Sequence, residues 1–263
     1  MCDALQLPIV DLSSPDRFST ANSIRQACID HGFFYLVNHG VDEELVNKVF
    51  EQISKFFSLP IEEKMKVIIK NYNGYSPLFA GKLDTTLSTK GDSKEGFYVS
   101  QLAGDLNQWP LEGMSAGTKL LSLIALSLKL DEDFFEKVGA FNEPLASLGL
   151  LHYPELAACM HAAAPMLAAI ASSLFSYIVT MGRWILPMRK YMVRLLIQIL
   201  ECSILLVTNG VPGLQICREK SEQPQVWEDV PSKSGAFIVN IGDMMERWTN
   251  CLFRSTLHRV LPP

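Results

Sequence analysis

The sequence lacks the marks of small cross-linked, zinc-stabilised or nucleic-acid-binding proteins. Its six cysteines are scattered and form no Cys-x-x-Cys pair, so neither a zinc site nor a disulfide framework is indicated. Lysine and arginine do not cluster among aromatic residues, and the net charge is −5, which argues against a nucleic-acid partner. The start, MCDALQLPIVDLSS, lacks the basic residues and long apolar run of a secretory signal. We therefore expect a reduced, cytoplasmic protein.

The composition also argues against wholesale disorder. Hydrophobic residues make up 48% of the 263 residues and charged residues 19%, which is enough to build a large core. No internal repeat or low-complexity tract is present. A chain of this length suits one large domain or two small ones.

The first part of the chain, up to about residue 110, has the pattern of mixed helices and strands. The predicted elements are strands at PIVDL (8–12) and FFYLV (33–37), a helix that begins near Ser14-Pro15-Asp16, and an amphipathic helix at DEELVNKVFEQISKFF (42–57). On the first helix, Phe18, Ile24 and Cys28 are expected to form the buried face. Two further helical pieces are predicted between Leu120 and Val138, the second starting near Asp131.

The last part, from about residue 205, changes to an alternation with a period of two. LQIC, QVWEDV, GAFIVNIG and LFRSTLHRV predict short strands separated by turns, which is typical of a sandwich or barrel.

The middle of the chain fits neither neighbour. Residues 157–181 contain no charged residue and precede the basic stretch GRWILPMRKYMVR, so one interpretation is a transmembrane helix. The alternatives are a buried helix, or residues that do not belong to the evolved fold. Pro165 and the many small residues weaken the membrane interpretation, and we expect no membrane association.

Several stretches, in the right order, resemble the plant-type Fe(II)/2-oxoglutarate-dependent oxygenases of the isopenicillin N synthase-like group. They are LPIVDLSS, ACIDHGFFYLVNHGVDEELV, FFSLPIEEKMK, GDSKEGFYV, LLHYPE, NGVPGLQI, VWEDVP, GAFIVNIGDMMERWTN and LFRSTLHRVLPP. The resemblance implies a mixed α+β fold with a double-stranded β-helix (jelly roll) core, flanking helices and an atypical central segment.

The resemblance also suggests a division of the chain into four parts. We expect an N-terminal oxygenase-family domain at 1–115, a helical connection and the start of the core at 116–156, an atypical insert or frame-shifted segment at 157–204, and a truncated C-terminal part of the jelly roll at 205–263.

The family chemistry implied is oxidation of a small organic molecule by hydroxylation, desaturation or ring closure. Such enzymes hold Fe(II) with two histidines and one carboxylate, with 2-oxoglutarate as co-substrate and ascorbate as reductant. By resemblance, His258 occupies the position of a metal ligand and Tyr153 that of a residue contacting 2-oxoglutarate. We expect a monomer. Without the resemblance, a lone His258 on an alternating strand would be read as structural.

Two parts of the family pattern are missing. The resemblance implies that the first two iron ligands come from a His-x-Asp pair, yet none of the five histidines is followed two positions later by Asp or Glu. The sequence also stops at Pro263, before the arginine and serine with which the family binds the far carboxylate of 2-oxoglutarate. The acids of GDSKEG (91–96) are expected in a turn, with no catalytic pair implied. We therefore expect this chain to be inactive as an oxygenase. The alternatives are a non-catalytic remnant or splice variant that binds a partner, or a protein that associates with a membrane through 157–181.

The stretch RLLIQILECS (194–203) stands where the family's His-x-Asp motif belongs. One permitted choice of codons for it reads Ala-His-Ser-Asp-Ser-Gly-Met-Leu in a shifted frame. Our hypothesis is that about 157–204 is a retained intron or alternative splice followed by a frame-shifted exon. The rival hypothesis is a real coding change in a diverged gene.

Overall fold

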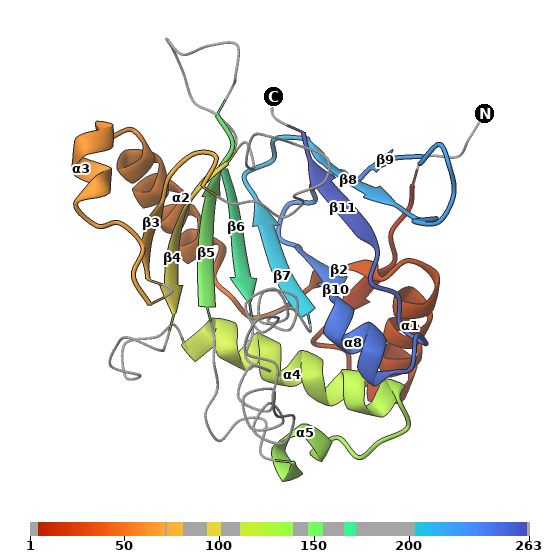
Figure 1. Ribbon diagram of the computed structural model, residues 1–263. Coiled ribbons are helices and arrows are strands. Elements are labelled where there is room, and N and C mark those ends of the chain that lie inside the picture. Colours follow the sequence, from red (N-terminus) through yellow and green to blue (C-terminus); the bar gives the residue numbers. More distant parts are fainter. Residues whose placement is uncertain are drawn as a thin grey trace, which may run out of the picture.

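The computed structural model describes residues 5–71, 73–80, 94–100, 111–138, 147–154, 166–171 and 203–261. The larger of its two sheets has the strand order β1-β2-β10-β7-β6-β5-β4-β3, and the smaller has the order β11-β8-β9 (Figure 1). The strands of the larger sheet are β1 (Ile9–Asp11), β2 (Phe33–Val37), β3 (Gly74–Ser76), β4 (Glu95–Ser100), β5 (Ser147–His152), β6 (Met166–Ala171), β7 (Ser203–Thr208) and β10 (Phe237–Ile241). Those of the smaller sheet are β8 (Leu214–Cys217), β9 (Glu228–Asp229) and β11 (Leu257–Val260).

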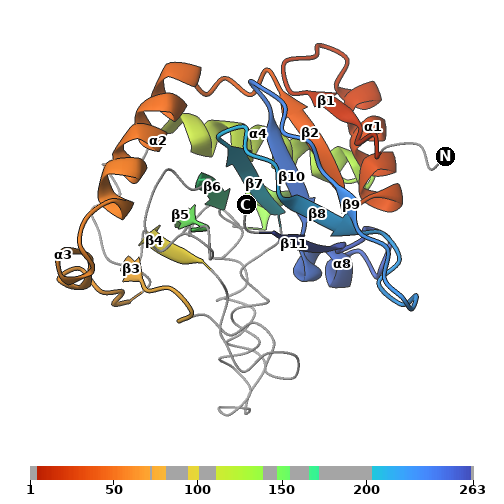
Figure 2. The same ribbon diagram turned by 90° about the horizontal axis from the view of Figure 1, so that it is seen from above.

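Helices cover one face of the larger sheet, and the smaller sheet packs on the other (Figure 2). The helices are α1 (Arg17–Asp30), α2 (Glu43–Phe57), α3 (Ile61–Met65), α4 (Leu111–Ser127), α5 (Phe134–Lys137) and α8 (Asp243–Trp248). One core lies between α1, α4 and the strands β2, β7 and β10. A second core lies between the two sheets and includes Phe33, Leu206 and Ile216.

Local signals account for the first elements. The Asp16 side chain accepts a hydrogen bond from the Ser19 amide at 3.0 Å and caps α1, and Asp42 caps α2 through the Glu44 amide at 2.8 Å. Pro60 follows α2 and stands at the N-cap position of α3. The predicted strands around 8–12 and 33–37 and the helix at 42–57 are confirmed.

Three expectations were wrong. Phe18 is 73% exposed, because at about 100° per residue it lies roughly a third of a turn away from the face formed by Ile24 and Cys28. QVWEDV contributes only the two residues of β9. Glu95 does not lie in a turn but begins β4, because it pairs with His152 of β5.

β6 comes from the uncharged middle segment. It pairs antiparallel with β5, from Ser147↔Ala171 to His152↔Met166, and with β7, from Leu167↔Thr208 to Ala171↔Ile204. Residues 166–171 are therefore a strand, which contradicts a single helix over 157–181. The rest of that range lies outside the described residues. Among the described residues, no helix is long and apolar enough to cross a membrane.

The turn after α8 contains two consecutive residues with positive φ, Asn250 at 53° and Cys251 at 63°. Asparagine tolerates this conformation, whereas cysteine is not favoured in it. Replacing Cys251 with glycine is therefore expected to raise the free energy of unfolding by about 1 kcal/mol, measured by urea unfolding. Asn250→Gly is the matched control and should give a smaller gain. If the Cys251→Gly protein is no more stable than the parent, the positive φ of Cys251 does not strain the backbone.

Candidate functional site

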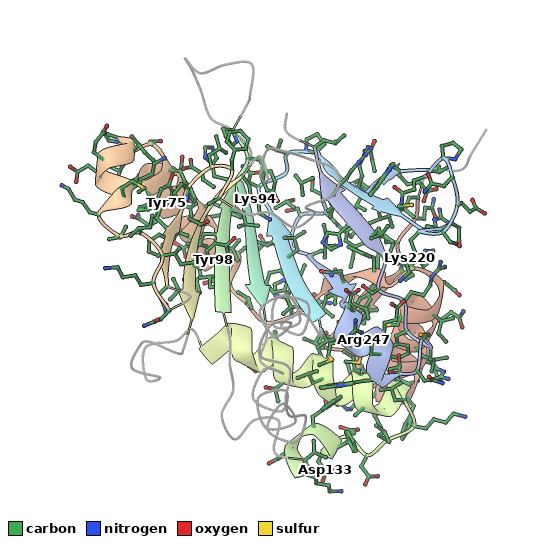
Figure 3. The ribbon with its side chains drawn as sticks, viewed as in Figure 1. Tyr75, Lys94, Tyr98, Asp133, Lys220 and Arg247 are labelled. Atoms are coloured by element: carbon green, nitrogen blue, oxygen red, sulfur yellow. The ribbon has the colours of Figure 1, made fainter. Side chains whose placement is uncertain are left out.

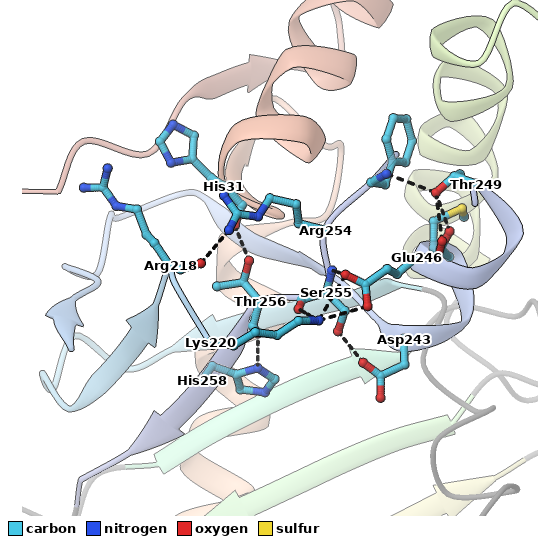
Figure 4. A network of polar contacts seen from close by, with 12 residues as sticks. His31, Arg218, Lys220, Asp243, Glu246, Thr249, Arg254, Ser255, Thr256 and His258 are labelled. Carbon is cyan, nitrogen blue, oxygen red and sulfur yellow. Dashed lines mark hydrogen bonds and ion pairs between the residues drawn. The ribbon is translucent and has the colours of Figure 1, made fainter. Parts of the chain in front are cut away.

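His258 lies on β11, which pairs antiparallel with β8 and places His258 opposite Ile216. The imidazole packs edge-on against the Phe33 ring, with 5.6 Å between the ring centroids. Its Nδ1 atom lies 3.3 Å from the Thr256 carbonyl oxygen (Figure 4). The residue is exposed on its remaining side. The position predicted for a metal ligand is thus held between its own strand and β2.

The segment leading into β11 is anchored to the end of α1. The Arg254 amide donates to the Cys28 carbonyl at 2.9 Å, and the Thr256 hydroxyl donates to the His31 carbonyl at 2.7 Å. The Arg254 guanidinium also donates to the Arg218 carbonyl at 2.6 Å (Figure 4). The backbone that carries His258 is therefore fixed by residues far away in the sequence.

Desolvation by the surrounding protein lowers the pKa of His258, although part of the side chain meets solvent. The Thr256 carbonyl opposes this shift, the positive charge of Lys94 adds to it, and the negative charge of Asp243 opposes it. The neutral imidazole is favoured, which is the form that binds metals.

Tyr153 follows β5 and is buried in the core between the two sheets, 9% exposed. It lines a cavity of about 10 Å³ together with Gly213 of the loop before β8 and Val260 of β11. A space of this size holds about one water molecule. The contact of Tyr153 with 2-oxoglutarate stays a prediction.

The described residues do not fit a three-ligand iron site. In this part of the chain, no group of three or more histidine, cysteine, aspartate or glutamate side chains could hold a metal ion. His258 contacts a backbone carbonyl and an aromatic ring in place of a second ligand. His161 lies outside the described residues.

A buried polar cluster that no sequence pattern predicted surrounds Glu95. Lys64 Nζ lies 2.8 Å from Glu95 Oε2, and the hydroxyl of Tyr75, labelled in Figure 3, donates a hydrogen bond to the same oxygen. The other carboxylate oxygen of Glu95, Oε1, lies 2.7 Å from His152 Nδ1. The side chains of Lys64 and Glu95 are only 9% and 8% exposed. These four residues join α3, β3, β4 and β5. No sequence signal marked them, since Lys64 and Glu95 stand in charged stretches that look solvated.

The charge of Glu95 is stabilised within this cluster. Burial alone would raise the pKa of its carboxyl group, but hydrogen bonds from His152, Lys64 and Tyr75 outweigh burial and lower the pKa to about 2. Burial and the bond to Glu95 raise the pKa of Tyr75, which keeps its proton. The Glu95 carboxylate is charged, hydrogen-bonded by three neighbours and enclosed, so the cluster suits a structural junction.

Comparisons with known protein families match both ends of the chain. Residues 7–114 match the model described as the N-terminal domain of a non-haem dioxygenase in morphine synthesis, and residues 199–263 match the 2OG-Fe(II) oxygenase superfamily. The chain is 33% identical to azadirone synthase of Melia azedarach over 286 residues, which cover 97% of this chain and 77% of the relative. It is 30% identical to 1-aminocyclopropane-1-carboxylate oxidase of Dictyostelium discoideum, with 98% and 78% covered.

A solved structure of similar fold is that of a full-length Neurospora crassa protein in complex with alpha-KG. It has a TM-score of 0.67 and 23% identity, and the match covers 100% of this chain and 81% of the Neurospora chain. This likeness confirms the predicted fold class, mixed helices and sheets with the jelly-roll core of these oxygenases. Proteins of this family use Fe(II) and 2-oxoglutarate. Because relatives 33% identical align along 97% of the chain, and both family models match in order, the chain belongs to the 2OG-Fe(II) oxygenase superfamily.

Proposed function

We propose that this chain is a cytoplasmic member of a lineage that oxidises a small organic metabolite by hydroxylation, desaturation or ring closure. We also propose that the chain itself does not catalyse this oxidation. The observation that carries the second part is the isolation of His258. The whole sequence contains no histidine followed two positions later by Asp or Glu, and the described residues offer His258 no companion ligands.

The chemistry of iron binding supports this proposal. Oxygenases of this type need two histidines and a carboxylate on one face of the metal, with the opposite positions left open. A single imidazole competes poorly with water for Fe(II). His258 also has one ring nitrogen directed at the Thr256 carbonyl and one ring edge against Phe33.

The origin of the defect in the middle segment is part of the proposal. The alignment with azadirone synthase spans 286 residues, more than the 263 of this chain, so the relative carries residues within the aligned span that have no counterpart here. We place the altered splice or shifted frame at about 157–204 because RLLIQILECS stands there in place of the family's His-x-Asp motif. Sequencing the transcript across codons 150–210 tests it, because codons that do not spell His-x-Asp in the shifted frame would exclude a frame shift.

The inactivity is tested with the purified chain under anaerobic loading of Fe(II). We expect no saturable Fe(II) binding by calorimetry, no change on His258→Ala, and no succinate from 2-oxoglutarate above a protein-free sample. His161→Ala is the matched control for a ligand outside the described residues. Saturable binding that either substitution abolishes, accompanied by succinate formation, would overturn the proposal.

A non-catalytic chain that binds a partner is the second candidate function. It is favoured by the same isolated His258 and by the retention of a large, continuous core in the described residues.

A further inference from the structure

His39 lies in the connection between β2 and α2 (residues 38–42), and only 7% of the residue is exposed. Its ring stacks on the ring of Phe237, with the centroids 3.9 Å apart and the two planes inclined by 7°. Phe237 is the first residue of β10, which lies between β2 and β7 in the larger sheet. The imidazole therefore joins the connection to an interior strand of the sheet.

Both nitrogens of the His39 ring have partners, and together these partners require the neutral ring. Nδ1 accepts a hydrogen bond from the Val41 amide at 3.2 Å, so the proton of the ring is on Nε2. The ring also donates to the backbone carbonyl of Gly235. A protonated ring would carry a second hydrogen on Nδ1, directed at the Val41 N–H. Protonation of His39 therefore breaks the hydrogen bond to Val41.

Glu43, the first residue of α2, lies against the same turn before β10. Gly235 has a φ of +67°, and a Cβ added to it would lie 2.5 Å from Glu43 Oε1. The ring of His39 and the carboxylate of Glu43 thus both meet Gly235. This approach places a negative charge near the ring, which bears on how readily the ring takes up a proton.

The charges around His39 do not compensate for its burial. β10 and the turn before it present the Phe237 ring and the Gly235 carbonyl, which are uncharged, and α2 presents the Glu43 carboxylate. Desolvation lowers the pKa of His39 below its ordinary value of 6.5, and the Gly235 carbonyl and the charge of Glu43 oppose this shift only in part. The closed arrangement therefore takes up a proton less readily than a connection released into water.

We propose that His39 is a pH-sensitive latch, and that its protonation releases the connection between β2 and α2 from Phe237 and Gly235. The backbone pairing of β10 with β2 and β7 contains no titratable group and stays intact. This device goes beyond the proposed function, because it needs neither iron nor a substrate.

The direction of the pH dependence follows from proton linkage. Above pH 6.5 the His39 ring is neutral in both the closed and the released arrangement, so the latch is closed. Below this value the released arrangement binds the proton first. Each further fall of one pH unit then favours release by up to about tenfold, until the closed form is protonated as well.

Amide hydrogen exchange, followed by NMR on the whole chain from about pH 7.5 to 5.5, tests this latch. The protection factor of the Val41 amide should fall by up to about tenfold per pH unit below 6.5. The Leu12 amide is the internal control, because it donates to the Val37 carbonyl at 3.0 Å in a bond without a titratable group. Equal losses of protection at Val41 and Leu12, or no loss at Val41, would overturn the proposal.

His39→Gln removes the titration but keeps a donor for the Gly235 carbonyl. The Val41 amide should then be less protected at neutral pH, and its protection should no longer fall as the pH is lowered. If the fall persists in His39→Gln, another group controls the connection.

Glu43→Gln tests the electrostatics of the latch without removing the histidine. The substitution removes the charge that favours the protonated ring, so the NMR titration midpoint of His39 should move to lower pH. Glu44→Gln is the matched control, because the Glu44 side chain is 75% exposed and lies 3.4 Å from Lys48. A parent midpoint at or above pH 6.5, or equal shifts in the two variants, would contradict the latch.

Discussion

Replacing Glu95 with glutamine is expected to lower the free energy of unfolding by about 3 kcal/mol at neutral pH. The substitution leaves the Lys64 ammonium group, 9% exposed, without its counter-charge. It also weakens the acceptor for Tyr75 and His152. A buried charge without a partner is costly because it has lost its water and gained nothing in return. Urea unfolding at pH 7 measures the difference.

The effect of Glu95 should also depend on pH. Its pKa is lowered to about 2 in the folded protein, against an ordinary value of 4.5. The stabilisation is therefore complete above about pH 4.5 and is lost as the pH falls towards 2, with a total of roughly 3 kcal/mol at 1.36 kcal/mol per pKa unit. The difference in free energy of unfolding between the parent and Glu95→Gln should therefore decrease as the pH falls from about 4.5 towards 2.

Glu63→Gln is the matched control, because the Glu63–Lys66 pair is exposed, with 50% of the Glu63 side chain accessible. Exposed pairs contribute at most about 1 kcal/mol, so this variant should behave almost like the parent. A Glu95→Gln protein that loses no more stability than Glu63→Gln would refute the role of the buried cluster.

Replacing Gly32 with alanine is expected to destabilise the fold by about 3 kcal/mol or more. Gly32 has a φ of +65°, and an added Cβ would lie 2.2 Å from the Arg254 carbonyl oxygen and 2.8 Å from the Thr256 hydroxyl. The nearest atom belongs to the backbone, so relief requires the segment before β11 to move away from α1. Thermal and urea unfolding measure the loss.

Gly210→Ala separates the clash from the backbone strain. Gly210 also has a positive φ, +88°, but nothing lies within 4 Å of an added Cβ. This control should cost only the strain of the left-handed conformation, about 1 kcal/mol. If Gly32→Ala and Gly210→Ala lower the free energy of unfolding by the same amount, the close approach of Gly32 to Arg254 does not contribute to the loss.

The sequence was sufficient for elements with local signals. Asp16 and Asp42 cap their helices, and the alternation of PIVDL and FFYLV marks two strands, so these were predicted correctly. The jelly-roll fold and the metal-ligand role expected for His258 depended on the family resemblance. The stacking of His39 on Phe237 could not be predicted, because it joins residues far apart in the sequence.

The buried cluster illustrates the limit of local reasoning. Glu95 and Lys64 are separated by 31 positions, and each stands among other charged residues, so nothing local distinguishes them from solvated side chains. Their burial follows only once α3 and β4 meet. The prediction for Phe18 was wrong in the opposite sense. Phe18 is apolar and was expected on the buried face of its helix, but it is exposed.

β6 has a consequence for how such a chain can change over generations. Its sequence, MLAAIA, contains no charge, no aromatic ring and three alanines, yet it joins β5 to β7 into one continuous sheet. Backbone hydrogen bonds on both sides demand an extended, uncharged strand and little else. This position in the sheet is therefore permissive: many short, uncharged sequences of modest size can occupy it without interrupting the sheet between β5 and β7.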